Sequence, residues 1–299
     1  MNPIRKQFDA NSAFPFSFAY KGTKSMQAEL PDHIHDWYEL VYVYRGKGTL
    51  FIDQTIYDMR EGDLFAIPGN TIHRALPDKD DPVTSTAVFF SPMIVQHASF
   101  GDSFSYLHCF EQQKKRKSYK FELAHPKRQE LEAALDRIQE EIRSSATGCR
   151  QAIVLQLQSM LLLLNRESGP AHGHGAVDSS VGPSWMKPVL LYIDDHLFDD
   201  GIEIGLSAVS CKASVTPAHF SRVFKQTIGM NLSEYIVTKR MMRAKELLND
   251  TDHKISLIAE MCGFESLPHF HRMFKKLLGV TPAAYRKLAW TPTRLPDRT

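Results

Sequence analysis

Short apolar runs alternate with turn residues in the first third of the chain. The runs cover residues 41–44, 49–52, 64–67 and 86–90, and they are rich in β-branched and aromatic side chains. Glycine, aspartate and proline residues lie between them, as they do between the strands of small β proteins. The pattern predicts an all-β barrel over residues 1–110.

The spacing of apolar residues then changes to a helical period. Apolar positions recur three or four residues apart, at Leu131, Leu135, Ile138 and Ile142. Residues 126–144 are therefore expected to form an amphipathic helix. A second helix, residues 150–165, is apolar around most of its circumference, so it must be covered by the barrel, by the first helix or by another subunit. We interpret the helical segment 111–166 as a dimerisation element of a homodimer.

Residues 167–183 interrupt both patterns. The segment is rich in glycine, serine, alanine and histidine and has no apolar period, which is typical of a flexible linker. We place a domain boundary there, so that a further domain covers residues 184–290 and a short tail covers residues 291–299.

No stretch of the chain has the length and apolarity of a membrane span. Residues 153–164 are the most apolar, but they are interrupted by polar side chains and fall short of the ~20 residues that a span needs. The N-terminus has no apolar run of the kind found in signal peptides. We therefore expect a cytoplasmic protein without a membrane partner.

The four cysteines have no metal-site or redox spacing and are expected to be reduced thiols.

A seven-residue pattern recurs within residues 184–290. Residues 219–225 read HFSRVFK, and residues 269–275, fifty positions later, read HFHRMFK. The register continues through Gly229 and Gly279, and again through the tyrosines at 235 and 285. Two copies of one supersecondary unit are therefore expected, each with an apolar stripe on one helix face and histidine, arginine and lysine on the other.

Each repeated helix has predicted ends. Thr216 and Ser266 are N-cap residues, and the glycines at 229 and 279 follow the C-termini. Shorter helices are expected before them, over residues 206–212 and 257–262. A short helix, a turn and a second helix with a polar face form a helix-turn-helix unit, whose second helix enters the major groove of DNA.

A long helix is expected between the two units. Asn231, with Glu234 three residues later, predicts a capping box at its start, and the helix should run to about Asn249. It would fix the relative placement of the two units.

The domain resembles the DNA-binding domain of the AraC/XylS family of transcription regulators over roughly residues 189–288. The resemblance is carried by HFSRVFKQTIG, SEYIVTKRMMRAKELL, ISLIAEMCGFES and HFHRMFKKLLGVTPAAYR. The first unit departs from the family pattern at Ser210, where a small alanine is usual, and at Ser214, where the turn glycine is usual. The resemblance implies a regulator that binds double-stranded DNA, and RNA polymerase if it is an activator.

The resemblance also implies which residues face DNA. They are Ala218, His219, Ser221, Arg222 and Lys225 in the first unit, and Leu267, Pro268, His269, His271, Arg272 and Lys275 in the second. The arginines can bind guanine edges with two hydrogen bonds, whereas the lysines suit phosphates. Residues 184–299 contain 16 Lys and Arg against 12 Asp and Glu, a modest excess that supports nucleic-acid binding.

Two segments of the barrel resemble the cupin motifs, which implies a double-stranded β-helix. They are HIHDWYE at residues 33–39 and GDLFAIPGNTIH at residues 62–73, with Asn70 where a glycine is usual. In metal-binding cupins the corresponding ligand positions are those of His33, His35, Glu39 and His73. Three interpretations are open: polar groups of an effector pocket, ligands of a divalent metal, or structural, hydrogen-bonded histidines. The first is our working hypothesis, with no cofactor required.

Two further features of the first domain have structural interpretations. Tyr42 and Tyr44 share a strand face, which we assign to the barrel core. The basic run at residues 114–117 is interpreted as a solvated loop.

The combined fold class is an α+β multidomain protein: a cupin-like barrel, a helical dimerisation segment, and an all-α domain with two helix-turn-helix units. We expect a DNA-binding regulator, not an enzyme, that responds to a small-molecule effector in the barrel. By family resemblance the effector is a sugar or a related metabolite. The alternatives are a metal-dependent cupin enzyme or a metal sensor fused to a DNA-binding domain, and a constitutive regulator whose barrel only dimerises.

Overall fold

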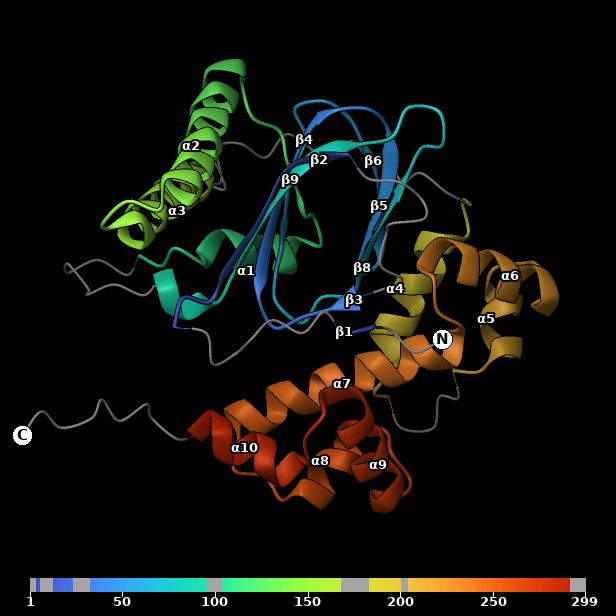
Figure 1. Cartoon of the computed structure of the whole chain (residues 1–299). Coiled ribbons are helices and arrows are strands. Elements are labelled where there is room, and N and C mark those ends of the chain that lie inside the picture. Colours follow the sequence, from blue (N-terminus) through green and yellow to red (C-terminus); the bar gives the residue numbers. More distant parts are fainter. Residues whose placement is uncertain are drawn as a thin grey trace, which may run out of the picture. The chain divides into compact units, whose positions relative to one another are not determined.

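The chain forms two compact units, residues 3–187 and residues 188–299 (Figure 1). The computed structural model describes residues 4–5, 13–23, 33–95, 104–167, 183–199 and 204–290. Apart from Glu167 and Pro183, the predicted linker at 167–183 lies outside the described residues, as does the predicted tail at 291–299.

Among the described residues of the first unit, the strands form two five-stranded sheets. One sheet has the order β1 (Ile4–Arg5), β3 (His33–Ile34), β8 (His73–Pro77), β5 (Gly48–Ile52) and β6 (Thr55–Met59). The other has the order β10 (Lys120–Phe121), β7 (Leu64–Ile67), β4 (Tyr38–Arg45), β9 (Thr84–Phe90) and β2 (Phe16–Thr23). The predicted apolar runs lie in β4, β5, β7 and β9, which confirms the β-rich first domain.

Alternation along β4 builds two separate apolar cores. Val41 and Val43 belong to the cluster inside the barrel, together with Leu50 and Ile52 of β5. The neighbouring positions on the other face, such as Leu40, belong to a second cluster that is covered by helices. The strands β7, β4 and β9 of this sheet are therefore buried on both faces for most of their length, whereas the residues of β2 at the edge are half-buried or exposed.

Tyr42 and Tyr44 share a face, as predicted, with ring centroids 4.9 Å apart. However, the face is the outer one: the Tyr42 hydroxyl donates a hydrogen bond to Glu132 on a covering helix. The assignment to the barrel core was wrong, because alternation separates the two faces of a strand without saying which is inside.

Three helices cover the outer face of the sheet that contains β2, β9 and β4 (Figure 1). They are α1 (His108–Arg116), α2 (His125–Ser144) and α3 (Cys149–Glu167), and a 3-10 turn, η1 (Pro92–Val95), follows β9. The two predicted helices at 126–144 and 150–165 correspond to α2 and α3. On α2 the apolar face is buried through Ile138, but Ile142 is 39% exposed because it lies in the last turn.

The segment at 111–166 is less uniform than the sequence predicted. Residues 114–117 are exposed, but Lys114, Lys115 and Arg116 form the last turn of α1 instead of a loop. Burial of Cys109, Phe110 and Gln113 on the opposite face explains this helix. In addition, β10 pairs with β7 and so adds a strand from this segment to the barrel. A two-residue strand is too short to leave an alternation pattern.

The second unit is helical within its described residues. Its elements are α4 (Met186–His196), α5 (Leu206–Lys212), α6 (Pro217–Ile228), α7 (Leu232–Asp250), α8 (Ile255–Met261), α9 (Leu267–Leu278) and α10 (Pro282–Trp290). The pairs α5–α6 and α8–α9 are the two predicted helix-turn-helix units, and α7 connects them. In the described part of the chain, no helix combines the length and apolarity that a membrane span requires.

Candidate DNA-binding and barrel sites

The second helix of each helix-turn-helix unit is fixed at both ends by local interactions. In α6 the Thr216 hydroxyl accepts a hydrogen bond from the backbone N–H of His219 at 3.3 Å. In α9 the Ser266 hydroxyl accepts one from the backbone N–H of His269 at 3.4 Å. Gly229 ends α6, and Gly279 ends α9 with a φ of +78°. The predicted caps are all present, so the ends of these helices follow from local sequence.

An apolar stripe anchors each of these helices to its own unit. Phe220, Phe224 and Ile228 are buried on α6, and their counterparts Phe270, Phe274 and Leu278 are buried on α9. The repeat extends to the next helices, where Tyr235 packs against Phe224 and Tyr285 against Phe274. The ring centroids are 5.6 and 5.7 Å apart in these two pairs. Burial of one face on a rigid aromatic core determines which side chains the other face presents to solvent.

The side chains predicted to contact DNA lie on the opposite faces. On α6 they are all exposed: Ala218, His219, Ser221, Arg222 and Lys225. On α9 five are exposed, namely Leu267, Pro268, His269, Arg272 and Lys275, and His271 is half-buried. The Arg222 guanidinium lies 3.4 Å from Nδ1 of His219, one turn earlier on the same face. Each helix thus presents an arginine one turn from its N-terminus and a lysine three residues further on.

The two turns share one backbone pattern. In the first unit the N–H groups of Ala213, Ser214 and Val215 donate to the carbonyls of Val209, Cys211 and Ser210. In the second unit Cys262, Gly263 and Phe264 donate to the equivalent carbonyls of Ile258, Glu260 and Ala259. The turn residues of the second unit lie 49 positions after their counterparts in the first unit. In contrast, the residues of α9 lie 50 positions after their counterparts in α6. The second turn is therefore one residue longer, which the repeat of the second helices alone did not reveal.

The predicted capping box starts the connecting helix α7. The side chain of Asn231 accepts a hydrogen bond from the backbone N–H of Glu234, and the Glu234 carboxylate accepts one from the N–H of Asn231, both at 2.9 Å. Buried residues of α7 pack in both directions, with Tyr235 against α6 and Met241 in the cluster of α8 and α9. One helix thus joins both helix-turn-helix units.

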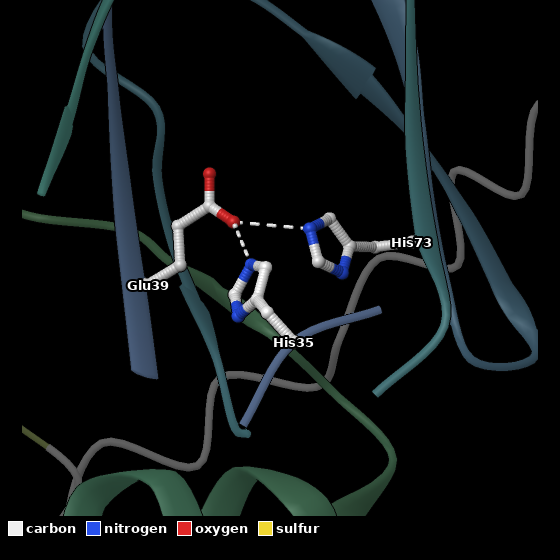
Figure 2. Close-up of side chains that lie close together, drawn as sticks. All are labelled: His35, Glu39 and His73. Atoms are coloured by element: carbon white, nitrogen blue, oxygen red, sulfur yellow. Dashed lines mark hydrogen bonds and ion pairs between the residues drawn. The ribbon is translucent and has the colours of Figure 1, made fainter. Parts of the chain in front are cut away.

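In the barrel, the structure brings three of the four predicted residues together (Figure 2). Oε2 of Glu39 lies 3.1 Å from Nε2 of His35 and 3.0 Å from Nε2 of His73. All three side chains are at most 4% exposed. The backbone of His33 pairs with that of His73 across β3 and β8, but the side chain of His33 lies outside the described residues.

Local structure explains why these three side chains meet. Glu39 shares the inward face of β4 with Val41, and His73 begins β8, whose Ala75 also faces inward. The loop before β8 approaches His35 closely: the Asn70 N–H donates to the His35 carbonyl at 2.7 Å, with Asn70 at a φ of +63°. A Cβ atom at Gly69 would lie 2.3 Å from the Asp36 carbonyl oxygen, so only glycine permits this approach.

Backbone carbonyls orient both imidazole rings. Nδ1 of His35 donates to the Trp37 carbonyl, and Nδ1 of His73 donates to the Thr71 carbonyl, each at 2.8 Å. Both Nε2 atoms therefore point toward the carboxylate of Glu39 (Figure 2). Burial alone would raise the pKa of Glu39, but the hydrogen bonds and charges of His35 and His73 outweigh it and keep this pKa well below its usual range.

Ser85 on β9 is an inward-facing residue that the sequence analysis missed. It lies between Val83 and Ala87, which both face the barrel interior, and it is 3% exposed. Its hydroxyl has no hydrogen-bond partner among the described residues. The alternation of Val83, Ser85 and Ala87 was the available signal, because it places one hydroxyl among inward apolar side chains.

Comparison with known proteins finds a matching family model for each of the two units. Residues 16–161 match the AraC-like ligand binding domain, and residues 209–288 match a helix-turn-helix domain. The chain belongs to the AraC family. It is a DNA-binding transcription regulator of this family, with a ligand-binding domain in its first unit.

Individual AraC-family proteins resemble the chain to different extents. Regulatory protein PocR of Salmonella typhimurium is 38% identical over 104 residues, which make up 35% of this chain and only 33% of PocR. The HTH-type transcriptional activator RhaS of Escherichia coli O1:K1 is 27% identical over 265 residues, 87% of this chain and 89% of RhaS. The C-terminal domain of the response regulator yesN from Fusobacterium nucleatum is 34% identical, with a TM-score of 0.31, and the match covers 33% of this chain and 95% of that domain.

Proposed function

We propose that this AraC-family regulator reads its operator with α6 and α9 and that a small-molecule effector in the barrel changes its affinity for DNA. The observation that carries the DNA-reading part is the repeated exposed face of the two helices. Arg222 and Arg272 occupy equivalent positions, each on a helix that is capped and anchored in the same way. A helix-turn-helix pair reads base edges from such a face, and the two units would contact major-groove segments about 10 bp apart.

The two kinds of basic side chain have different roles in this proposal. Arginine forms two parallel hydrogen bonds with the O6 and N7 atoms of guanine, so Arg222 and Arg272 specify sequence. Lys225 and Lys275 bind phosphates and position the helices without reading bases. The remaining exposed residues of the two faces contribute van der Waals contacts and hydrogen bonds.

The effector is a sugar or a related polar metabolite in this proposal. Glu39 with its two imidazoles could accept and donate hydrogen bonds to hydroxyl groups, and the buried hydroxyl of Ser85 would gain a partner. A buried polar group without a partner costs about 1–3 kcal/mol, which a bound ligand can recover. To act as a regulator, the effector must bind the DNA-competent state with a different affinity from the other state.

The helical hairpin of α2 and α3 is our candidate for a homodimer contact. Leu155 on α3 is 63% exposed, and Ile142 on α2 is 39% exposed.

Because RhaS is described as a transcriptional activator, we further propose that this chain activates transcription by contacting RNA polymerase. A regulator that binds the chromosome acts in the cytoplasm.

The test of DNA reading uses matched arginine variants. Operator sequences are first selected with the full chain, and the dissociation constant is then measured for Arg272→Ala, Arg222→Ala and, as a control, Arg243→Ala. Arg243 is an exposed arginine on α7 that pairs with Glu246 and is not among the residues predicted to contact DNA. We expect each of the first two variants to lose about 1–3 kcal/mol of binding free energy and to relax preference at one base pair.

Either of two results would contradict this part of the proposal. One is an unchanged operator affinity in both Arg222→Ala and Arg272→Ala. The other is an equal loss in the Arg243→Ala control.

The effector part is tested separately, by calorimetric titration of the full chain with sugars, polyols and organic acids, with Ser85→Ala beside wild type. If no compound binds and none changes operator affinity, the barrel does not sense such a ligand.

A further inference from the structure

Helices α6 and α9 differ in the contacts of their equivalent histidines. On α6 the guanidinium of Arg222 donates a hydrogen bond from Nη2 to Nδ1 of His219, at 3.4 Å. On α9 the ring of His269 packs instead against Phe264, with centroids 5.7 Å apart and ring planes at 68°. Among the described side chains of α9, no hydrogen bond joins His269 to Arg272. One arginine is therefore linked to the histidine three residues before it, and the other is not.

The length of the two turns explains this difference. The second turn has one more residue than the first, and it places the nearly buried ring of Phe264 beside α9. The first turn consists of Ala213, Ser214 and Val215, so it has no aromatic side chain that could hold His219 in the same way. The histidine of the first unit contacts its own helix, at the arginine one turn further on.

The chemistry of the pair leaves Arg222 able to bind DNA. An arginine side chain has only donors, so Nδ1 of His219 is the acceptor. It takes one of the five N–H groups of the guanidinium, and the other four remain for a guanine edge. A carboxylate in this position would bring a negative charge close to the DNA phosphates, but α6 contains no acidic residue. A neutral imidazole orients the guanidinium without weakening its attraction to DNA.

A long arginine side chain loses conformational freedom when it binds a base. The loss is smaller when the side chain is already held near the bound geometry. We propose that His219 is a positioning residue, which holds Arg222 ready for guanine, whereas Arg272 reads its base without help from His269. This inference rests on the proposed function, because it requires both arginines to read bases.

The test compares base preference, measured with the full chain and duplex DNA that carries the selected operator. For each arginine, the base pair concerned is the one at which its alanine variant loses preference. The discrimination ratio is the dissociation constant for an operator with this base pair replaced, divided by that for the selected operator. His219→Ala removes the acceptor. His219→Asn keeps an acceptor, because the amide oxygen can take the place of Nδ1. His269→Ala is the matched variant of the second unit.

We expect a discrimination ratio of about 10 or more in wild type. In His219→Ala the ratio at the base pair of Arg222 should fall about 3- to 10-fold, as the loss of one hydrogen bond predicts. His219→Asn should restore most of it, and adding His219→Ala to Arg222→Ala should change it no further. In His269→Ala the ratio at the base pair of Arg272 should stay within about twofold of wild type. Overall affinity is not the readout, because both histidines lie on faces predicted to contact DNA.

The positioning role is overturned if His219→Ala keeps the wild-type ratio or if His219→Asn loses as much as His219→Ala. It is also overturned if His269→Ala lowers the ratio of its own unit by the same factor, since the hydrogen bond would then make no difference. An unchanged ratio in Arg222→Ala, at every base pair of the operator, would overturn base reading by Arg222 and this inference with it. A loss in Arg222→Ala without any effect of His219→Ala overturns the positioning role alone.

Discussion

In the first helix-turn-helix unit a serine occupies the left-handed position of the turn, whereas in the second unit a glycine does. Ser214 has a φ of +55° and Gly263 a φ of +73°. Both donate the same backbone hydrogen bond, to the carbonyls of Cys211 and Glu260 respectively. A left-handed conformation costs an ordinary residue roughly 1–2 kcal/mol and costs glycine almost nothing. The turn geometry is therefore set by the backbone pattern, and the two units adopt it at different cost.

The first helix of each unit has one equivalent buried position, and this position also holds a serine in the first unit but not in the second. Ser210 in α5 and Ala259 in α8 are both 2% exposed. The serine hydroxyl donates to the Ser207 carbonyl at 3.1 Å, so the polar group is satisfied inside its own helix. The departures from the AraC pattern at Ser210 and Ser214 leave the fold of the first unit intact because each has a local solution.

The extra residue in the second turn is used for packing. After the left-handed residue, the first unit has only Val215 before its N-cap, whereas the second has Phe264 and Glu265. Phe264 is 7% exposed, and its ring centroid lies 5.3 Å from that of Phe270. An aromatic side chain therefore packs the second turn against the core. In the first turn the equivalent contact comes from half-buried Val215, which buries less apolar area.

The largest expected difference between the units is in thiol reactivity. Burial raises the pKa of Cys262, in the second turn, to about 12, whereas Cys211 on α5 is exposed. A higher pKa leaves less thiolate, the reactive form, so alkylation of Cys262 near pH 8 should be roughly 10³-fold slower than that of an ordinary thiol. Timed alkylation read by peptide mass spectrometry should show Cys211 modified first.

Cys109 provides an internal reference for this experiment in the first compact unit. Burial also raises its pKa to about 12, so it should react as slowly as Cys262. Equal rates for Cys211 and Cys262 in the folded chain would show that the second turn opens readily. This result would contradict the view that both turns are well formed.

Truncating the aromatic anchors should cost the most stability. Phe220 on α6 and Phe270 on α9 are both fully buried at equivalent positions. Changing either to alanine should lower the free energy of unfolding by about 3–5 kcal/mol, because the lost burial adds to the cavity left behind. Urea unfolding followed by circular dichroism measures each loss. A loss below 1 kcal/mol for one of them would show that its unit packs loosely and that the repeat is not equivalent in energy.

Exchanging the turn residues should give effects of opposite sign. Gly263→Ala forces a left-handed alanine and brings its Cβ within 3.0 Å of the Arg240 guanidinium, so it should destabilise by about 1–2 kcal/mol. Ser214→Gly removes the left-handed strain but loosens the unfolded chain, so it should stabilise by about 1 kcal/mol or less. Thermal unfolding of both variants beside wild type measures the signs. Destabilisation by Ser214→Gly would mean that the serine side chain contributes more than its strain costs.

Local features of the second unit were the most predictable from sequence. The N-caps, the capping box at Asn231 and the positions of Gly229 and Gly279 depend on residues within four positions of each other, and all were found in the structure. The one-residue shift between the turns was missed, because the repeat is strongest in α6 and α9 and the first helices share fewer identical residues.

Features of the barrel that depend on distant residues were less predictable. The outward direction of Tyr42 depends on Glu132 of α2, ninety positions away, and β10 exists through its pairing with β7. His35, Glu39 and His73 could be named in advance. The Nδ1 hydrogen bonds that aim both rings at Glu39 could not, because they depend on the backbone path of two loops.

The smallest effects should come from the N-caps of α6 and α9. Thr216→Ala and Ser266→Ala each remove one hydroxyl acceptor from an exposed helix start, and each should cost about 1 kcal/mol of unfolding free energy. The conservative exchanges Thr216→Ser and Ser266→Thr keep the acceptor and should change stability by only a few tenths of a kcal/mol. Chemical denaturation of the four variants separates the hydroxyl from the methyl group. If Thr216→Ser costs as much as Thr216→Ala, the cap of α6 acts through its methyl contact, and the N-termini of α6 and α9 are stabilised by different groups.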